Sequence, residues 1–335
     1  MPNRADTGRL RELIAAGKGK RVVVVGDLIA DEYVYGRIAR VSREAPVLIL
    51  EYNATEILPG GAGNAATNVA SLGGVVRLVS LAGRDEAGRR LFKVLPRNVE
   101  RAGLIRPAGY RTPVKTRILA GGIHSAKQQV VRIDRYTGEP VSDAHRDVAE
   151  RAALRAIAHA DAVLVSDYGS GLVTPRFVAE LAARLRARKH RVPILIDSRY
   201  ALTRYRGLTA CAPNESEVEQ VLGVTIDDRP AVLERAGRAI LKRTRMECVV
   251  ITRGSRGMAL FERGKRTVHI PIFGSDQIAD VTGAGDTVMA TMTLALAAGG
   301  TFEEAARLAN YAGGLVVMKR GTATVSAAEL RRAVS

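Results

Sequence analysis

The stretch Asp280-Val281-Thr282-Gly283-Ala284-Gly285-Asp286-Thr287, followed by a largely apolar run to Ala298, is the most informative part of this chain. Two glycines around an alanine allow a tight turn, so that backbone NH groups converge on one point, favourable for an anion, where a helix begins. Asp286 would repel a phosphate bound there unless it takes a proton from an attacking hydroxyl. The segment therefore predicts phosphoryl transfer, with Asp286 as the base and Gly283, Ala284 and Gly285 as the anion hole. The alternative is that Asp286 merely caps the helix.

The rest of the chain alternates strands with helices. Arg21 to Gly26 is a continuous Val-rich run, as expected of a parallel strand buried on both faces. Further strands are predicted at 75–81, 162–166, 193–196 and 248–252, and helices at 64–72, 146–159, 175–189 and 231–243. This order predicts an α/β fold with a doubly wound, mostly parallel sheet flanked by helices.

Two segments, about 33–58 and 112–134, interrupt the alternation with β-branched, alternating stretches and no helix. Residues 1–20 are charged and are expected to form an N-terminal extension before a single domain at 21–334. They hold no apolar core of a secretory signal, and no window reaches the roughly 18 apolar residues of a membrane span. We therefore expect a cytoplasmic protein.

Four motifs, in order, resemble those of the PfkB (ribokinase-like) carbohydrate kinases. They are Gly26-Asp27-Leu28-Ile29-Ala30-Asp31, Gly60-Gly61-Ala62-Gly63-Asn64, Asn214-Glu215-Ser216-Glu217 and the turn that ends at Asp286. The resemblance covers Arg21 to Val334. It implies a ribokinase-like fold whose two β segments form a small lid over the sugar site, a surface that such kinases often use to form homodimers.

Other stretches resemble one group within this family, the D-glycero-β-D-manno-heptose 7-phosphate kinases of ADP-heptose synthesis. They are 33–36, 43–46, 166–168, 204–207 and 321–326. That resemblance implies phosphorylation of the anomeric hydroxyl to give the 1,7-bisphosphate, for lipopolysaccharide or another glycan. The chain departs from the group where Ser198-Arg199-Tyr200 follows Asp197, a place where Pro-Lys-Gly is expected.

The resemblance also implies the nucleotide site, for ATP and Mg²⁺. Asn214 and Glu217 would organise magnesium and the phosphates, with Glu217 acting on the metal indirectly. The expected adenine-side residues are Thr252, Gly254, Gly257 and Asn310. Read without the resemblance, Asn-x-x-Glu is equally a helix start after Pro213.

The sugar side follows partly from side-chain chemistry. Asp27 and Asp31 can accept hydrogen bonds from hydroxyls, Asn64 can accept and donate them, and Gly60-Gly61 allows a close backbone approach. Turn or capping roles are the alternative for both aspartates. A sugar that already carries a phosphate needs a cation, and the candidates in the lid-like segment are Lys115, Arg117, Lys127 and Arg132.

Charge raises a competing class of function. The chain has 51 Lys and Arg against 34 Asp and Glu, a net charge of +17. No aromatic residues interleave with its densest basic run, 184–191, and no nucleic-acid module is present, so this run indicates a solvated surface. The leading hypothesis is a heptose 7-phosphate kinase. The alternatives are a related kinase for another sugar, sugar phosphate or nucleoside, and a non-catalytic or nucleic-acid-binding protein on this fold.

Overall fold

The structure, a computed structural model, describes residues 4–121, 127–136, 140–227, 229–274, 280–319 and 321–334. Within these ranges the main sheet has ten strands in the order β14-β13-β12-β11-β10-β9-β1-β4-β5, with β6 beside β4. Its strands are β1 Arg21–Gly26, β4 Val75–Leu81, β5 Val99–Glu100, β6 Leu104–Ile105, β9 Ala162–Asp167, β10 Ile194–Ser198, β11 Ala210–Cys211, β12 Cys248–Thr252, β13 Met258–Glu262 and β14 Val268–Ile270. All pairs are parallel except β12 with β13 and β13 with β14.

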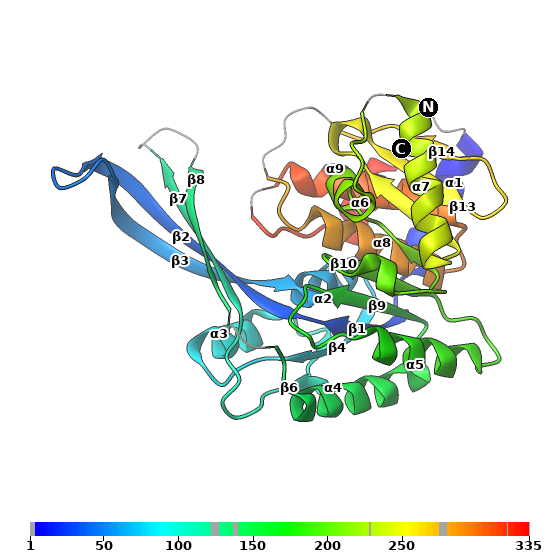
Figure 1. Cartoon of the computed structure of the whole chain (residues 1–335), viewed down its shortest axis with the longest axis horizontal. Helices are drawn as coiled ribbons and strands as arrows, with labels where there is room; N and C mark the ends of the chain where they lie inside the picture. The colour runs from blue at the N-terminus through cyan, green and yellow to red at the C-terminus, as the bar shows by residue number, and fades with distance from the viewer. Residues whose placement is uncertain are drawn as a thin grey trace.

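Helices cover both faces of this sheet (Figure 1). They are α1 Arg4–Ala16, α2 Ala62–Ser71, α3 Glu86–Val94, α4 Asp143–Ala156, α5 Pro175–Arg186, α6 Glu215–Leu222, α7 Pro230–Thr244, α8 Ala284–Ala297, α9 Phe302–Val317 and α10 Ala327–Ala333, with short 3₁₀ turns at Ile157–His159, Leu202–Arg204 and Gly254–Arg256. Alternate residues of β1 enter two hydrophobic clusters, one with α2, α8 and α9 and the other with α4, α5 and α7. The predicted doubly wound α/β fold is confirmed.

Helix α8 is buried almost all round, which explains why its sequence shows no polar face. Every residue from Asp286 to Ala295 is buried. The hydroxyls of two of its threonines are satisfied inside the helix: Thr291 donates to the carbonyl of Thr287, and Thr293 to that of Met289. A helix that is apolar all round belongs in the core of a protein, so the first turn of α8 is held firmly between the sheet and its neighbouring helices.

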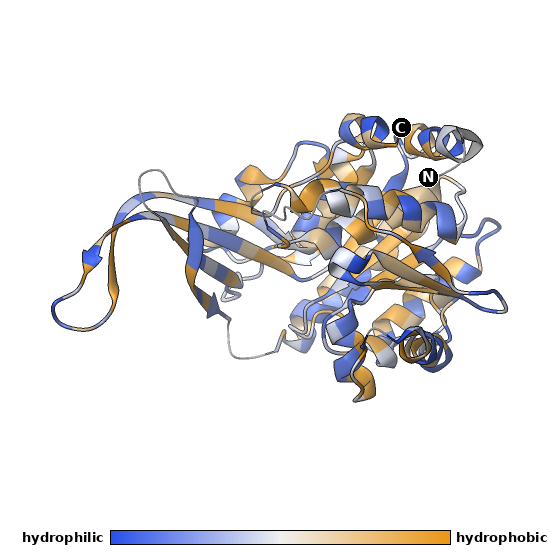
Figure 2. Cartoon of the chain, turned by 90° about the horizontal axis from the view of Figure 1, so that it is seen from above, coloured by the Kyte–Doolittle hydropathy of each residue, from blue (hydrophilic) through white to orange (hydrophobic). Residues whose placement is uncertain are grey.

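The two β segments form a second sheet of four strands, in the order β3-β2-β7-β8, that extends from the core as a long arm (Figure 1). Its strands are β2 Leu28–Val41, β3 Leu48–Gly61, β7 Val114–Gly121 and β8 Gln128–Arg135. Residues 122–126 of the expected lid lie outside the described residues. Seen from above in Figure 2, polar and apolar residues intermix along this arm, whereas the strands of the core are predominantly hydrophobic. We call these four strands the lid.

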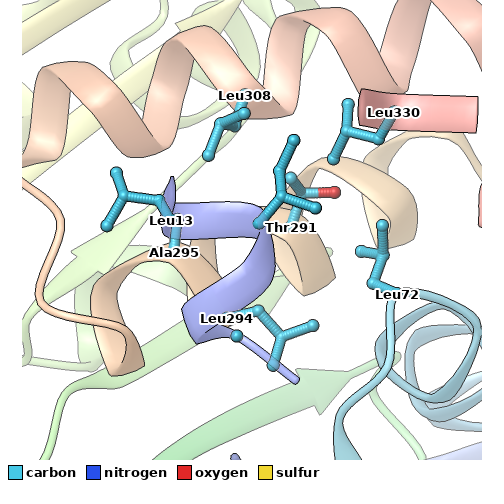
Figure 3. A pocket seen from close by; sticks show the side chains of 9 residues that line it. Leu13, Leu72, Thr291, Leu294, Ala295, Leu308 and Leu330 are labelled. Atoms are coloured by element: carbon cyan, nitrogen blue, oxygen red, sulfur yellow. The ribbon is translucent and has the colours of Figure 1, made fainter. Parts of the chain in front are cut away.

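The first helix packs on the body of the protein and is not a detached extension. Leu10 and Leu13 of α1 are 1% and 2% exposed and join the same hydrophobic cluster as α8 and α9. Figure 3 shows Leu13 beside Thr291 and Leu294 of α8 at a small apolar cavity of about 20 Å³. That volume holds about one water, so the cavity is a packing defect rather than a ligand site.

Candidate active site

Asp286 lies in the first turn of α8, facing α2. Gly283, the residue that caps this helix, has φ 78°, and a Cβ there would lie 2.5 Å from Nδ2 of Asn64. Glycine is therefore required by both backbone conformation and space. Opposite Gly285 the space is open, since nothing lies within 4 Å of where its Cβ would be. The turn thus brings its backbone close to Asn64 and leaves one side accessible.

The NH groups of this turn are not equivalent. Ala284 donates its NH to the carbonyl of Val281 at 3.2 Å, so that group is already used. In the part of the chain that the structure describes, the NH groups of Gly285 and Asp286 have no acceptor. Unpaired NH groups at a helix start favour an anion. The NH of Gly283 likewise has no acceptor among the described residues, so Gly283, Gly285 and Asp286 can supply the donors of the predicted anion hole, and Ala284 contributes its small size.

The carboxylate of Asp286 is 5% exposed and receives two hydrogen bonds. Nδ2 of Asn64 donates to Oδ2 at 2.8 Å, and the hydroxyl of Tyr168 donates to Oδ1 at a long 3.4 Å. Burial raises the pKa of Asp286 to about 7, and the charge of Asp31 adds to the rise, while the bonds from Asn64 and Tyr168 oppose it. A pKa near neutrality suits a general base.

The side chain of Asn64 is buried and bonds to other residues of the protein rather than facing open space. It is 1% exposed, and its second NH points to the carbonyl of Gly283 at 3.3 Å. Both donors of the amide are therefore taken, and its oxygen accepts from Asn68. The prediction that Asn64 donates to sugar hydroxyls does not match this geometry, because its amide is directed at Asp286.

Tyr168 and Lys115 complete the surroundings of Asp286. Tyr168 follows β9, and the ammonium of Lys115, from lid strand β7, lies 4.9 Å from the centre of its ring. In the described part of the chain Lys115 has no carboxylate within ion-pair distance. Burial lowers the pKa of Lys115 against the attraction of Asp31 and Asp134. Tyr168 lies in the stretch 166–168 that resembles the heptose kinases, but no local pattern predicts that it contacts Asp286, 118 positions away.

Asp27 holds the loop that carries Tyr168. Its Oδ2 accepts from the NH groups of Tyr168 and Ser170 at 2.7 and 3.3 Å, and its Oδ1 accepts from the hydroxyl of Ser170. Gly61 has φ 56°, and a Cβ there would lie 2.4 Å from the carbonyl of Asp27. Asp27 and Gly61 therefore shape the site, and the carboxylate expected to bind sugar is already occupied by this loop.

Asp31 joins the lid to the C-terminal part of the chain. It forms a buried ion pair with Arg117, and its Oδ2 lies 3.4 Å from the hydroxyl of Thr322, which also bonds the hydroxyl of Tyr33 at 2.7 Å. Gly60 allows this arrangement, since a Cβ there would lie 2.3 Å from Oδ2 of Asp31. Arg117 is consequently committed to Asp31.

The four lid cations do not converge on one point. Arg132 donates from Nε and Nη2 to the two carboxylate oxygens of Asp134, and the Lys127 ammonium lies 5.1 Å from the ring centre of Tyr35. Gln128 pairs with Ala120 and Lys127 lies one residue beyond it, so Lys127 is about 20 Å along the lid from Lys115. Among the residues that the structure describes, Lys115 is the one of these four cations that lies beside Asp286 without a carboxylate partner.

The Asn-x-x-Glu motif forms a capping box at the start of α6. Oδ1 of Asn214 accepts from the NH of Glu217, and the Glu217 carboxylate accepts from the NH of Asn214, both at 2.9 Å. The helix-start interpretation is therefore confirmed. The capping box does not use both carboxylate oxygens of Glu217, because Oε1 faces the guanidinium of Arg199 at 3.8 Å. Arg199 stands where the chain departs from the heptose kinases.

Asp197, at the end of β10, is a candidate that sequence reasoning missed. Burial raises its pKa to about 8, and the charges of Asp286 and Glu217 raise it further. Its side chain thus lies within the electrostatic reach of both the predicted base and the predicted metal-organising residue. Its position after a run of buried strand residues was the available signal, because ligands bind outside the carboxyl ends of parallel strands.

The expected adenine-side residues are structurally engaged to different degrees. Thr252 ends β12 and donates its NH to the carbonyl of Pro213 at 3.0 Å, which fixes it beside α6. Asn310 of α9 donates to the carbonyl of Pro271 at 2.8 Å. A Cβ on Gly257 would lie 2.1 Å from the carbonyl of Ile270, whereas Gly254 faces open space. Gly257 is therefore required by packing, and Gly254 is the freer of the two glycines.

Two kinds of feature are absent from the described ranges. No group of three or more His, Cys, Asp or Glu side chains there is arranged to hold a metal ion. No helix there combines the length and apolar character of a membrane span.

Comparison with known proteins agrees with the fold and the motifs. The profile of the pfkB family carbohydrate kinases matches residues 20–329. The chain therefore belongs to the pfkB family of carbohydrate kinases, phosphotransferases with an alcohol group as acceptor.

Among curated proteins, the chain is similar to proteins called bifunctional protein HldE. That of Trichlorobacter lovleyi is 40% identical over 332 residues, which are 98% of this chain and 66% of that protein. That of Geobacter metallireducens is 40% identical over 323 residues, 96% of this chain and 64% of that protein. The chain thus spans just under two thirds of the length of these relatives.

Among solved structures, the chain is similar to Escherichia coli phosphofructokinase-2 in complex with potassium, with a TM-score of 0.73 and 18% identity over 95% of this chain and 98% of that one. It is also similar to Arabidopsis thaliana ribokinase complexed with ribose and ATP, with a TM-score of 0.67 and 20% identity over 95% and 99%. These similarities confirm the ribokinase-like fold.

Proposed function

We propose that this chain transfers the γ-phosphoryl group of ATP to the anomeric hydroxyl of D-glycero-β-D-manno-heptose 7-phosphate. The observation that carries the proposal is the buried carboxylate of Asp286 beside the unpaired NH groups of Gly285 and Asp286. A base and an anion-binding turn at one helix start are what transfer of a phosphoryl group to a hydroxyl requires. The product would be the 1,7-bisphosphate used in ADP-heptose synthesis.

The chemistry follows from this geometry. The sugar oxygen forms a bond to the γ-phosphorus, its proton passes to Asp286, and the bond from phosphorus to the bridging oxygen breaks to release ADP. The NH groups of Gly285 and Asp286 offset charge on the transferred group. Asn64 and Tyr168 hold the carboxylate of Asp286 toward the acceptor.

The nucleotide side of the site fits magnesium. Mg²⁺ prefers one or two carboxylates together with substrate phosphates rather than a cage of protein ligands. Glu217 has an oxygen outside its capping box, and Asp197 lies nearby, so Asp197 would hold the ion and Glu217 would act on it indirectly. When bound, it would supply charge neutralisation for the nucleotide phosphates.

The choice of acceptor rests on the lid and on the relatives. Lys115 offers an ammonium without a carboxylate partner beside Asp286, as a substrate with its own phosphate needs. The similarity to the HldE proteins extends over nearly the whole chain, and the earlier resemblance to heptose 7-phosphate kinases points the same way. The word bifunctional in the relatives' name refers to those longer proteins, and the proposal concerns the kinase reaction.

We also propose that the chain forms a homodimer through the lid. Val131 and Ile133, two residues apart on β8, are each 48% exposed and point to the same face of the lid. Arg117 pairs with Arg132, which lies between them, so their face is opposite to the one that carries Arg117 and Asp31. Exposed apolar residues on an unpaired edge strand favour association.

An acceptor panel tests the proposed function. ADP release would be measured with Mg-ATP and, separately, D-glycero-β-D-manno-heptose 7-phosphate, fructose 6-phosphate, ribose, fructose and adenosine. We expect selective turnover of the heptose phosphate. Turnover of another acceptor would support the kinase reaction and contradict the heptose phosphate as its substrate. No turnover of any acceptor would favour a non-catalytic protein on this fold.

A further inference from the structure

Asn68 lies one turn after Asn64 on α2 and is fully buried. Its Nδ2 donates to the backbone carbonyl of Asn64 at 3.1 Å and to the side-chain oxygen of Asn64 at 3.0 Å. Its Oδ1 accepts from the hydroxyl of Thr287 on α8, also at 3.0 Å. A chain of polar contacts therefore runs from Thr287 through Asn68 and Asn64 to Asp286.

The donors and acceptors in this series of hydrogen bonds have a fixed direction. A backbone carbonyl only accepts hydrogen bonds, so the side of Asn68 that faces Asn64 must be its NH₂ group. The oxygen of the Asn64 side chain must then face Asn68, because that oxygen accepts from the same NH₂ group. The NH₂ group of Asn64 is consequently turned toward Asp286.

We propose that Asn68 is a positioning residue for the kinase reaction, holding the amide of Asn64 in the orientation that donates to the carboxylate of Asp286. The inference rests on the proposed role of Asp286 as the base. Without Asn68, the oxygen of the Asn64 amide loses its donor, and only the bonds to the carbonyl of Gly283 and to the carboxylate of Asp286 still hold the orientation of the amide.

The role differs from that of a simple bridge between α2 and α8. The bond from Asn64 lowers the pKa of Asp286 against the rise caused by burial. Loss of that bond would raise the pKa of Asp286, whereas loss of a bridge alone would lower stability without moving the pKa. The other groups that act on Asp286 come from different elements, namely Asp31 on β2, Lys115 on β7, Tyr168 after β9 and Asp197 on β10. They stay unchanged in the variants below.

The test is the pH dependence of kcat/KM for the heptose 7-phosphate, or for the acceptor that the panel identifies. Asn68→Leu removes the amide and keeps the branching of the side chain, and Thr287→Val removes the hydroxyl that faces Asn68. Thr291→Val is the matched control, because among the described residues the hydroxyl of Thr291 bonds only to the carbonyl of Thr287, one turn earlier in the same helix. Thermal unfolding would be recorded for each variant.

We expect the acid limb of Asn68→Leu to move upward by about one pH unit, as loss of a hydrogen bond to a charged group implies. Its kcat/KM would be about fivefold below wild type at pH 7, and the gap would narrow toward pH 9. Thr287→Val would move the limb in the same direction by less, and Thr291→Val would keep the wild-type limb.

Folded variants at Asn68 and Thr287 with the wild-type acid limb would overturn the proposal, even if their plateau rates were lower. If Asn68→Leu does not fold, Thr287→Val decides. Failure of the underlying function is distinguishable, because Asp286→Asn would then retain wild-type turnover.

Discussion

Two buried aspartates, Asp27 and Asp286, and the partly buried Asp197 surround the site, and their pKa values lie well above the ordinary value of 3.8. Burial is the largest cause for each, and the resulting pKa is about 6 for Asp27, about 7 for Asp286 and about 8 for Asp197. Between pH 3.8 and these values the folded chain binds protons that the unfolded chain has released. The free energy of unfolding therefore falls as the pH rises through this window.

Asp197→Asn is expected to remove part of this loss of stability at high pH. The variant should gain stability relative to wild type as the pH rises, so that its difference in Tm is larger at about pH 9 than at about pH 5 by a few degrees. Differential scanning calorimetry at the two pH values measures this. Glu100→Gln, at an exposed carboxylate paired with Arg77, should differ from wild type equally at both. A constant difference for Asp197→Asn would contradict the raised pKa.

Lys115→Ala is expected to weaken binding of the acceptor phosphate. Loss of one charge-assisted hydrogen bond should raise KM for the sugar phosphate by about 10 to 100-fold and leave KM for ATP nearly unchanged. Steady-state kinetics with each substrate varied in turn would show the split. Arg132→Ala, which removes a cation already paired with Asp134, is the control. An equal effect of the two variants would argue against Lys115 as the phosphate ligand.

At the scale of single residues, the sequence predicted the chemistry of the site better than the contacts between its side chains. Asp286 and its glycines were recognisable because the turn and the helix start are local. Asn64 was assigned to the sugar, whereas its partner is a residue 222 positions away, a contact that no local pattern encodes. The capping box of Asn214 and Glu217 was predictable as an alternative, since its spacing alone defines it.

Helix α8 positions the base, and α1 supports α8 from the far side of the core. Leu13 of α1 faces Thr291 and Leu294 at the small cavity shown in Figure 3. Leu13→Ala should lower the free energy of unfolding by about 2 to 5 kcal/mol, as removal of a buried leucine does. Urea denaturation measures the loss.

The exposed Glu12, on the same helix, offers a control. Glu12→Ala should change stability by about 0.5 kcal/mol or less, because its pair with Arg9 is at the surface. If Leu13→Ala lowered the free energy of unfolding as little as Glu12→Ala, α1 would be an extension that does not stabilise the core.

Elements with a distinct period were predictable, and those without one were not. The Val-rich run at 21–26 and the alternating lid segments correspond to β1 and the lid strands. Helix α1 was missed because its many charges hide two core leucines spaced three residues apart. The antiparallel strands β13 and β14 close one edge of the sheet, and a short strand at an edge carries little signal.

At the scale of the whole molecule, the lid exposes apolar residues that a monomer would leave in contact with water. All eight residues of β8 are exposed. Ile133→Glu should convert a lid-mediated dimer into a monomer, because a charge would replace an exposed apolar contact. Size-exclusion chromatography with light scattering distinguishes the two states. Val148→Glu, at an exposed position on α4, should leave the dimer intact. A wild-type monomer, or a dimer insensitive to Ile133→Glu, would contradict this interface.

The most direct test of the central claim is the turnover of Asp286→Asn beside wild type, with ATP affinity measured in parallel. The substitution preserves size and removes the proton acceptor. If Asp286 is the base, kcat should fall by about 100 to 10,000-fold while the affinity for ATP changes little. Turnover at the wild-type rate would show that the buried carboxylate at the start of α8 does not take the proton.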